Sequence, residues 1–120
     1  MPTFNEMVAA AKERIREVSP EQAEAAMGIA VLIDVREIHE YEMGAIDGAA
    51  HIPRGVLEST IGGHVPDPQT EVILYCASGG RSALAAESLQ GLGYQNVSSM
   101  AGGVERWIQE GRRWSTPLTL

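Results

Sequence analysis

The residue types best suited to chemistry lie together at positions 76–82, in the sequence Cys-Ala-Ser-Gly-Gly-Arg-Ser. Cys76 is the only cysteine of the chain, and a cysteine thiolate is a strong nucleophile. The apolar run Val72 to Tyr75 precedes it, and the helix-prone run Ser82 to Leu92 follows it. The pattern therefore places Cys76 at the end of a strand, in a loop that leads into a helix.

Small residues would let the backbone of this loop approach a ligand closely. Gly79 and Gly80 permit a curled conformation in which the N–H groups from Ala77, Ser78 and onward to Ser82 converge on one point. The positive end of the following helix and the charge of Arg81 would add to the attraction for an anion. The loop is thus a candidate anion cradle, and a cysteine at its floor would be biased toward the thiolate. The alternative is a structural role, because free cysteine often packs as a small hydrophobe.

Two further charged residues follow a buried apolar run. Asp34 and Arg36 come directly after Ile29 to Ile33, at the sheet end where Cys76 is also expected. We expect Asp34 to pair with Arg36 or with Arg81 and so to support the loop. The three histidines are dispersed, without metal-ligand spacing, so we expect neither a metal site nor a cofactor; they are His39, His51 and His64.

Strands alternate with helices along the whole chain. The apolar strands are nearly continuous, which is typical of a parallel sheet covered on both faces, and the fold class is therefore α/β with three layers. The expected strands are 17–19, 29–33, 49–52, 72–75 and 96–100, and the expected helices are 4–16, 20–27, 37–43, 56–61, 82–92 and 104–110. Residues 46–48 read as a turn, and residues 62–69 read as a surface loop. Thr3 with Glu6, and Ser19 with Gln22, fit capping boxes at the starts of the first two helices. No clear pattern follows Arg112.

Composition narrows the classes of function. A chain of 120 residues suffices for one domain with its own core. A net charge of -7 argues against nucleic-acid or anionic-membrane partners, because both require a basic face. One cysteine forms no internal disulfide, and neither a signal peptide nor a membrane-spanning run is visible, so the expected location is cytoplasmic.

Four stretches, in this order, resemble the rhodanese-like (sulfurtransferase) domain in its single-domain form. The resemblance covers roughly residues 18–112, with 1–17 as an N-terminal helix extension and 113–120 as a C-terminal tail. The matching stretches are 32–37 (Leu-Ile-Asp-Val-Arg-Glu), 44–53 (Gly-Ala-Ile-Asp-Gly-Ala-Ala-His-Ile-Pro), 76–82, and 100–107 (Met-Ala-Gly-Gly-Val-Glu-Arg-Trp).

The resemblance implies a central, mostly parallel five-stranded sheet flanked by helices. It also implies that Cys76 attacks the sulfane sulfur of a donor such as thiosulfate and becomes a persulfide held by residues 77–82. The persulfide would then pass to cyanide, a thiol or a protein acceptor. A monomer or a homodimer is expected, with the N-terminal helix or the tail as the natural interface.

Loop length and one substitution bear on the substrate. Four residues separate Cys76 from Arg81, whereas the related dual-specificity phosphatases and arsenate reductases carry five around a tetrahedral oxyanion. The short loop therefore favours sulfur transfer over phosphatase or arsenate reductase activity. Ala77, however, stands where many thiosulfate-using members have a basic residue. That departure leaves a non-enzymatic sulfur carrier or protein-interaction module as the alternative function.

Overall fold

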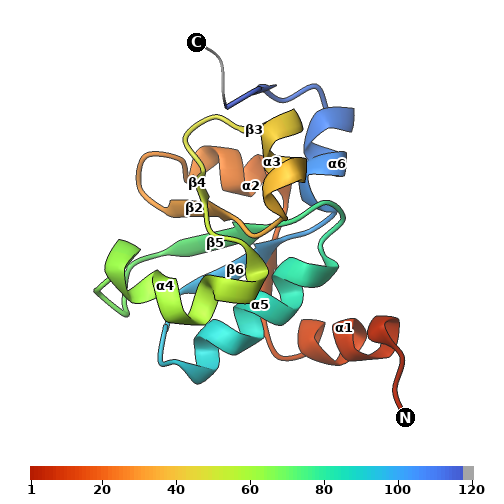
Figure 1. Cartoon of the computed structure of the whole chain (residues 1–120), viewed down its shortest axis with the longest axis vertical. Helices are drawn as coiled ribbons and strands as arrows, with labels where there is room; N and C mark the ends of the chain where they lie inside the picture. The colour runs from red at the N-terminus through yellow and green to blue at the C-terminus, as the bar shows by residue number, and fades with distance from the viewer. Residues whose placement is uncertain (118–120) are drawn as a thin grey trace.

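Five parallel strands form the centre of the computed structural model, which describes residues 1–117 (Figure 1). Their order across the sheet is β1-β6-β5-β2-β4, and every neighbouring pair is parallel. This arrangement confirms the predicted α/β fold class with a five-stranded sheet. The strands are β1 (Arg16–Val18), β2 (Val31–Asp34), β4 (Ala50–His51), β5 (Val72–Tyr75) and β6 (Val97–Met100).

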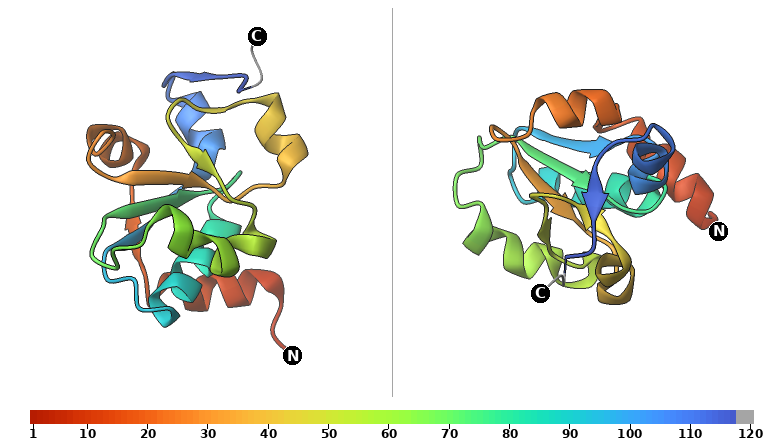
Figure 2. Two further views of the ribbon diagram at one scale, coloured as in Figure 1. Left: turned by 60° about the vertical axis from the view of Figure 1, so that its left-hand side comes forward. Right: turned by 90° about the horizontal axis from the view of Figure 1, so that it is seen from above.

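Helices cover both faces of this sheet (Figure 2). One face packs against α4 and α5, and the other packs against α2 and α6. The helical segments are α1 (Phe4–Lys12), α2 (Pro20–Ala25), α3 (Ile38–Met43), η1 (Arg54–Val56), α4 (Leu57–His64), α5 (Gly80–Gly91) and α6 (Gly103–Gln109). Helix α1 lies outside this three-layer arrangement, beside α5 (Figure 1).

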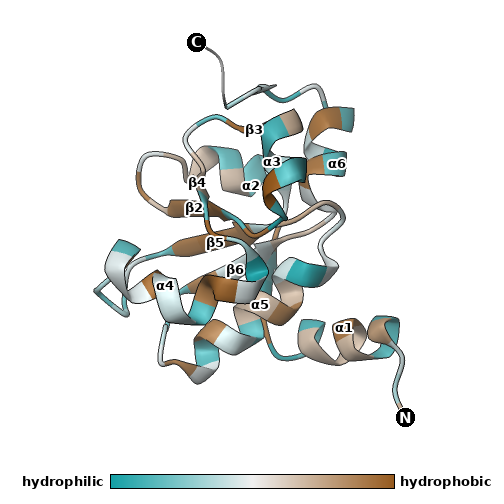
Figure 3. Cartoon of the chain, viewed as in Figure 1, coloured by the Kyte–Doolittle hydropathy of each residue, from teal (hydrophilic) through white to brown (hydrophobic). Residues whose placement is uncertain are grey.

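Strand periodicity explains how one sheet supports two hydrophobic clusters. Successive side chains of a strand point to opposite faces. In β5, Val72 and Leu74 accordingly join the cluster under α4 and α5, whereas Ile73 and Tyr75 join the cluster under α2 and α6. All four side chains are buried, and β5 is among the most hydrophobic segments of the chain (Figure 3). The continuous apolar run before Cys76 is thus the signature of a strand buried on both faces.

Capping signals set the first two helix starts. Thr3 and Glu6 form the expected capping box before α1, and Ser19 and Gln22 form another before α2. Helix α1 ends at Lys12, earlier than predicted, because the chain turns into edge strand β1 at Arg16.

Three local expectations were wrong. Residues 62–64 were expected in a loop but complete helix α4. Ile46 was expected in a turn but belongs to β3 (Ala45–Ile46), which pairs antiparallel with β7 (Trp114–Ser115). The segment after Arg112, expected to lack a pattern, thus forms a short strand, and the Trp114 ring occupies the space where a side chain at Gly44 would stand.

The last three residues of the expected tail, 118–120, lie outside the described residues. Within residues 1–117, none of the helices has the length and apolar character needed to cross a membrane.

Candidate active site

Cys76 lies directly after β5, at the carboxyl end of the sheet, and its side chain is buried. The backbone N–H of Gly79 donates to its Sγ at 3.1 Å, and that of Ser82 donates at 3.4 Å. Gly79 is the N-cap of α5 and has a φ of 105°, a left-handed conformation that favours glycine. The sulfur therefore sits at the positive end of a 12-residue helix, where negative charge is stabilised.

The remaining cradle residues differ in what they present to the sulfur. Ala77 and Gly80 are half-buried, and Ser78 is exposed. Within the described residues, 1–117, the backbone N–H groups that donate to Sγ are those of Gly79 and Ser82. The unmodified thiol therefore has two backbone donors, fewer than the six residues of the expected cradle.

A pair of buried hydroxyl groups lies beside the sulfur. The Oγ of Ser82 is 3.4 Å from Sγ of Cys76 and 2.7 Å from Oγ of Ser99 on β6. Both serine side chains are fully buried, and each satisfies the other. Sequence reasoning missed Ser99, because nothing in its residue type shows that it faces the cysteine loop.

The turn between β6 and α6 supports the loop from behind. The N–H groups of Val104 and Glu105 donate to the carbonyl oxygens of Cys76 and Ala77 at 2.9 and 3.0 Å. Gly103 has a φ of 59°, and a Cβ there would stand 2.6 Å from the Cys76 carbonyl oxygen. Two glycine-containing turns at the ends of adjacent strands thus pack together. The two turns have similar sequence patterns, and this similarity is the signal from which their contact could have been predicted.

Asp34 pairs with Arg36, one of the two partners that the sequence allowed. The Arg36 Nη2 lies 2.8 Å from Oδ2 of Asp34 and also donates to the Gly44 carbonyl at 2.6 Å. Burial lowers the pKa of Arg36, but the hydrogen bond and charge of Asp34 outweigh it and raise that pKa overall. The pair ties the end of β2 to the start of β3, and the guanidinium lies 5.8 Å from the ring centroid of Tyr75, which precedes the cysteine.

Arg81 pairs with Glu40 rather than with Asp34. Its Nη1 and Nη2 donate to Oε1 and Oε2 of Glu40 at 2.7 and 2.9 Å, a bidentate ion pair. These hydrogen bonds are the main reason that the pKa of Glu40 falls to about 2, and they raise the pKa of Arg81. The sequence-based expectation missed Glu40, which lies 41 residues before Arg81 and is brought to it by helix α3.

The histidines lie apart from the sulfur. His39 and His64 are exposed, and His51 contacts the Arg36 carbonyl through Nε2 at 2.7 Å while its ring stacks on Tyr41. Across residues 1–117, no group of three histidine, cysteine or acidic side chains is placed to hold a metal ion.

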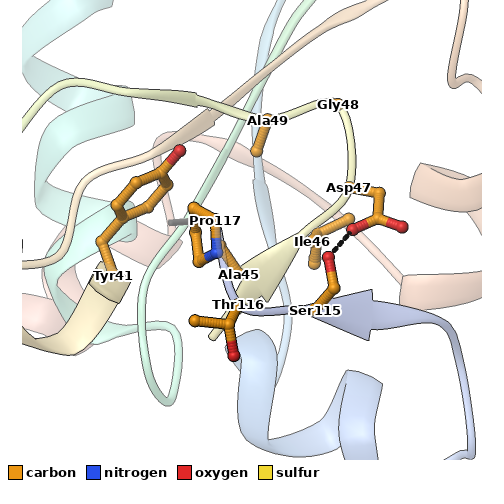
Figure 4. Close-up of a pocket in the computed structure, with 9 residues that line it drawn as sticks. All are labelled: Tyr41, Ala45, Ile46, Asp47, Gly48, Ala49, Ser115, Thr116 and Pro117. Atoms are coloured by element: carbon orange, nitrogen blue, oxygen red, sulfur yellow. Dashed lines mark hydrogen bonds between the residues drawn. The ribbon is translucent and has the colours of Figure 1, made fainter. Parts of the chain in front are cut away.

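Two hollows on the surface of the described residues, 1–117, do not include the cysteine loop. The larger, of about 530 Å³, lies between α3 and the β3–β7 ribbon, where the Ser115 hydroxyl points at the Asp47 carboxylate (Figure 4). The smaller, of about 260 Å³, is an apolar groove lined by Arg36, Glu40, Met43, Gly44, Ile108 and Trp114. The cysteine is the stronger candidate for chemistry, because a buried nucleophile with aligned donors is more specific than a hollow.

Comparison with known proteins gives one family. The model of the rhodanese-like domain matches residues 19–110. The chain is 39% identical over 94 residues to a thiosulfate sulfurtransferase of Pseudomonas entomophila, a match that covers 77% of this chain and 84% of that protein. It is 36% identical over 76 residues to a Bacillus subtilis protein provisionally named a sulfur carrier, covering 63% of this chain and 40% of the relative. The chain thus spans less than half the length of that second relative.

Solved structures share the fold. A thiosulfate sulfurtransferase of Pseudomonas aeruginosa superposes with a TM-score of 0.85 at 28% identity, covering 97% of this chain and 23% of that one. A Rhodopseudomonas palustris protein of unknown function, described as a possible tyrosine phosphatase, has a TM-score of 0.83 at 28% identity, and 96% of each chain is covered.

Proposed function

The chain belongs to the rhodanese-like family, and from that premise we propose that it is a sulfurtransferase that carries sulfane sulfur as a persulfide on Cys76. The functional unit in this proposal is residues 18–112, with residues 1–17 and 113–120 as extensions. The observation that supports it best is the convergence of the Gly79 and Ser82 N–H groups on Sγ. Such donors stabilise negative charge on sulfur, which both the attacking thiolate and the persulfide carry.

The reaction has two transfers. In the first, the Cys76 thiolate attacks the outer sulfur of thiosulfate, the S–S bond breaks, and sulfite leaves with the bonding electron pair. In the second, an acceptor nucleophile such as cyanide, a thiol or a protein thiolate attacks the outer sulfur of the persulfide and returns the Cys76 thiolate. Charge and atoms balance in each step, and neither step requires a metal or a redox cofactor.

The roles of the surrounding residues follow from their contacts. In the thiol form Cys76 Sγ donates to Ser82 Oγ, and in the thiolate form the Ser82 hydroxyl takes over as the donor to the charged sulfur. The Ser99 hydroxyl orients that of Ser82. Asp34 and Arg36 support the site by holding Tyr75 and the end of β2. We place the reaction in a reducing compartment such as the cytoplasm, because the free thiol must remain reduced.

A second candidate is a sulfur carrier that receives sulfur from a partner protein and turns over thiosulfate poorly. Two observations favour it: Ala77 adds no charge to the loop, and Glu40 neutralises the nearby Arg81. The relationship to the provisionally named sulfur carrier supports it as well.

A turnover assay tests both candidates. Thiocyanate formation from thiosulfate and cyanide would be measured for the wild type and for Cys76→Ser. Rapid turnover that the substitution abolishes supports the enzyme, whereas labelling of Cys76 by a persulfidated protein without turnover supports the carrier. Phosphate release from an aryl phosphate, with no sulfur transfer, would overturn both.

A further inference from the structure

The guanidinium next to the cysteine loop faces a carboxylate. Arg81 is the second residue of α5, and Glu40 of α3 binds both of its terminal nitrogens. About a third of the Arg81 side chain and a quarter of the Glu40 side chain remain exposed, so this ion pair reaches the surface. Arg81 is also close enough to Cys76 for the charge of the sulfur to raise the pKa of Arg81. Glu40 also lines the apolar groove between α3 and α6.

Other charges near the loop do not restore a positive site. Arg36 is buried and neutralised by Asp34. Glu37 is exposed and close enough to raise the pKa of Arg81, after the larger contributions of Glu40. Ala77, directly after the cysteine, carries no charge. An anionic sulfur donor therefore approaches a guanidinium that is already paired, with a further carboxylate close by.

We propose that Glu40 is a specificity-determining residue that selects against doubly charged sulfur donors and favours donors with one negative charge or none. The proposal rests on the sulfur transfer proposed above and adds the class of donor. Repulsion from a fixed carboxylate grows in proportion to the charge of the donor, so a dianion is disfavoured twice as strongly, in free energy, as a monoanion. Such discrimination needs no contact with the reacting sulfur, only proximity of Glu40 to the donor's path.

Two donors with the same chemistry and different charge separate this effect from others. Thiosulfate is a dianion and releases sulfite, whereas the methanethiosulfonate anion is a monoanion and releases methanesulfinate. In both, the Cys76 thiolate attacks the outer sulfur, the S–S bond breaks, and the leaving group takes the electron pair. The product on the protein is the same Cys76 persulfide.

The experiment measures the second-order rate constant of Cys76 persulfide formation with each donor. In Glu40→Gln, one negative charge is lost and the side chain keeps its size. We expect this rate constant to rise about tenfold with thiosulfate and about threefold with methanethiosulfonate, since the site is partly exposed and the repulsion is screened. The matched control is Glu87→Gln, which breaks the surface pair with Arg14. This variant removes the same charge from a position about 9 Å along α5 from Arg81. Both rate constants of the control should therefore stay within twofold of the wild type.

The ratio of the two donors decides the outcome. An equal change with both donors, or a thiosulfate rate within twofold of the wild type, would overturn the proposal while leaving the sulfur transfer intact. Absence of persulfide from the wild type with both donors and with a persulfidated protein would instead overturn the proposed function, and this inference with it. Persulfide formed from the persulfidated protein alone would overturn this inference and leave the sulfur transfer intact. Wild-type protein gives an independent check, because added salt screens repulsion and should raise the thiosulfate rate more than the methanethiosulfonate rate. A thiosulfate rate that falls with salt contradicts the proposal.

Discussion

The backbone N–H of Val104 donates to the carbonyl oxygen of Cys76 at 2.9 Å, so the first turn of α6 holds the candidate nucleophile from behind. This contact joins the loops after β5 and β6, neighbouring strands whose parallel pairing brings both carboxyl ends to one edge of the sheet. The position of the sulfur is thus set by a second strand-to-helix turn as well as by its own loop.

The first prediction concerns the close approach of these turns. Gly103→Ala would force a methyl group against the backbone of Cys76 and Ala77, in a left-handed conformation that alanine adopts poorly. We expect the free energy of unfolding to fall by about 2–4 kcal/mol and persulfide formation to slow. Urea unfolding and the single-turnover rate would measure both effects. Gly62→Ala is the control, because Gly62 lies in α4 with open space around it and should change stability by less than about 1 kcal/mol.

The second prediction concerns the buried ion pair. Asp34→Ala leaves the Arg36 charge buried without its partner, so we expect a loss of about 3–5 kcal/mol in the free energy of unfolding. The rate of persulfide formation should also fall, because the pair supports Tyr75. Glu24→Ala breaks the exposed pair with Arg112 and should lose less than about 1 kcal/mol. Unchanged kinetics in a folded Asp34→Ala protein would show that the pair does not support the loop.

The third prediction concerns the hydroxyl pair. Ser99→Ala removes the partner of the Ser82 hydroxyl and leaves Cys76 Sγ as its remaining neighbour. We expect the fold to lose about 1–3 kcal/mol and the Cys76 persulfide to have a shorter lifetime. Ser82→Ala and the double variant complete a cycle, and a coupling energy near zero would argue against a shared network.

The fourth prediction concerns the pH dependence of the Arg81–Glu40 pair. The folded pKa of Glu40 is about 2, below its usual value of 4.5, chiefly through the hydrogen bond from Arg81. A depressed carboxylate pKa stabilises the fold above pH 4.5, and this contribution is lost as the pH falls toward 2. The stability difference between the wild type and Glu40→Gln should therefore be about 1 kcal/mol or less at neutral pH, because the pair is partly exposed, and should vanish in acid. A difference that grows in acid would contradict this assignment.

Much of the fold follows from local patterns in the sequence. The run before Cys76 is continuous and apolar over four residues, which is typical of a strand buried on both faces, and the structure has β5 there. Thr3 and Ser19 predicted helix starts because their caps depend on residues only three positions away. Such signals depend on residues that are close in the sequence, so the structures they predict are retained in the folded protein.

Other features depend on contacts between distant residues. Strand β3 has two residues, and it pairs with β7 where Trp114 packs against Gly44, a contact that no local pattern reveals. The sequence did not determine which carboxylate pairs with Arg81. In the structure, the position of α3 brings Glu40 rather than Asp34 to Arg81. Ser99 was missed for the same reason, since the burial of a serine depends on what lies opposite it.

The central claim is that Cys76 carries transferred sulfur, and the intact mass of the protein tests it most directly. After incubation with methanethiosulfonate and removal of the donor, the wild type should gain the mass of one sulfur atom and lose it again on treatment with a thiol. Cys76→Ser should gain nothing. Wild-type protein that keeps its original mass with methanethiosulfonate, thiosulfate and a persulfidated protein donor would contradict the account.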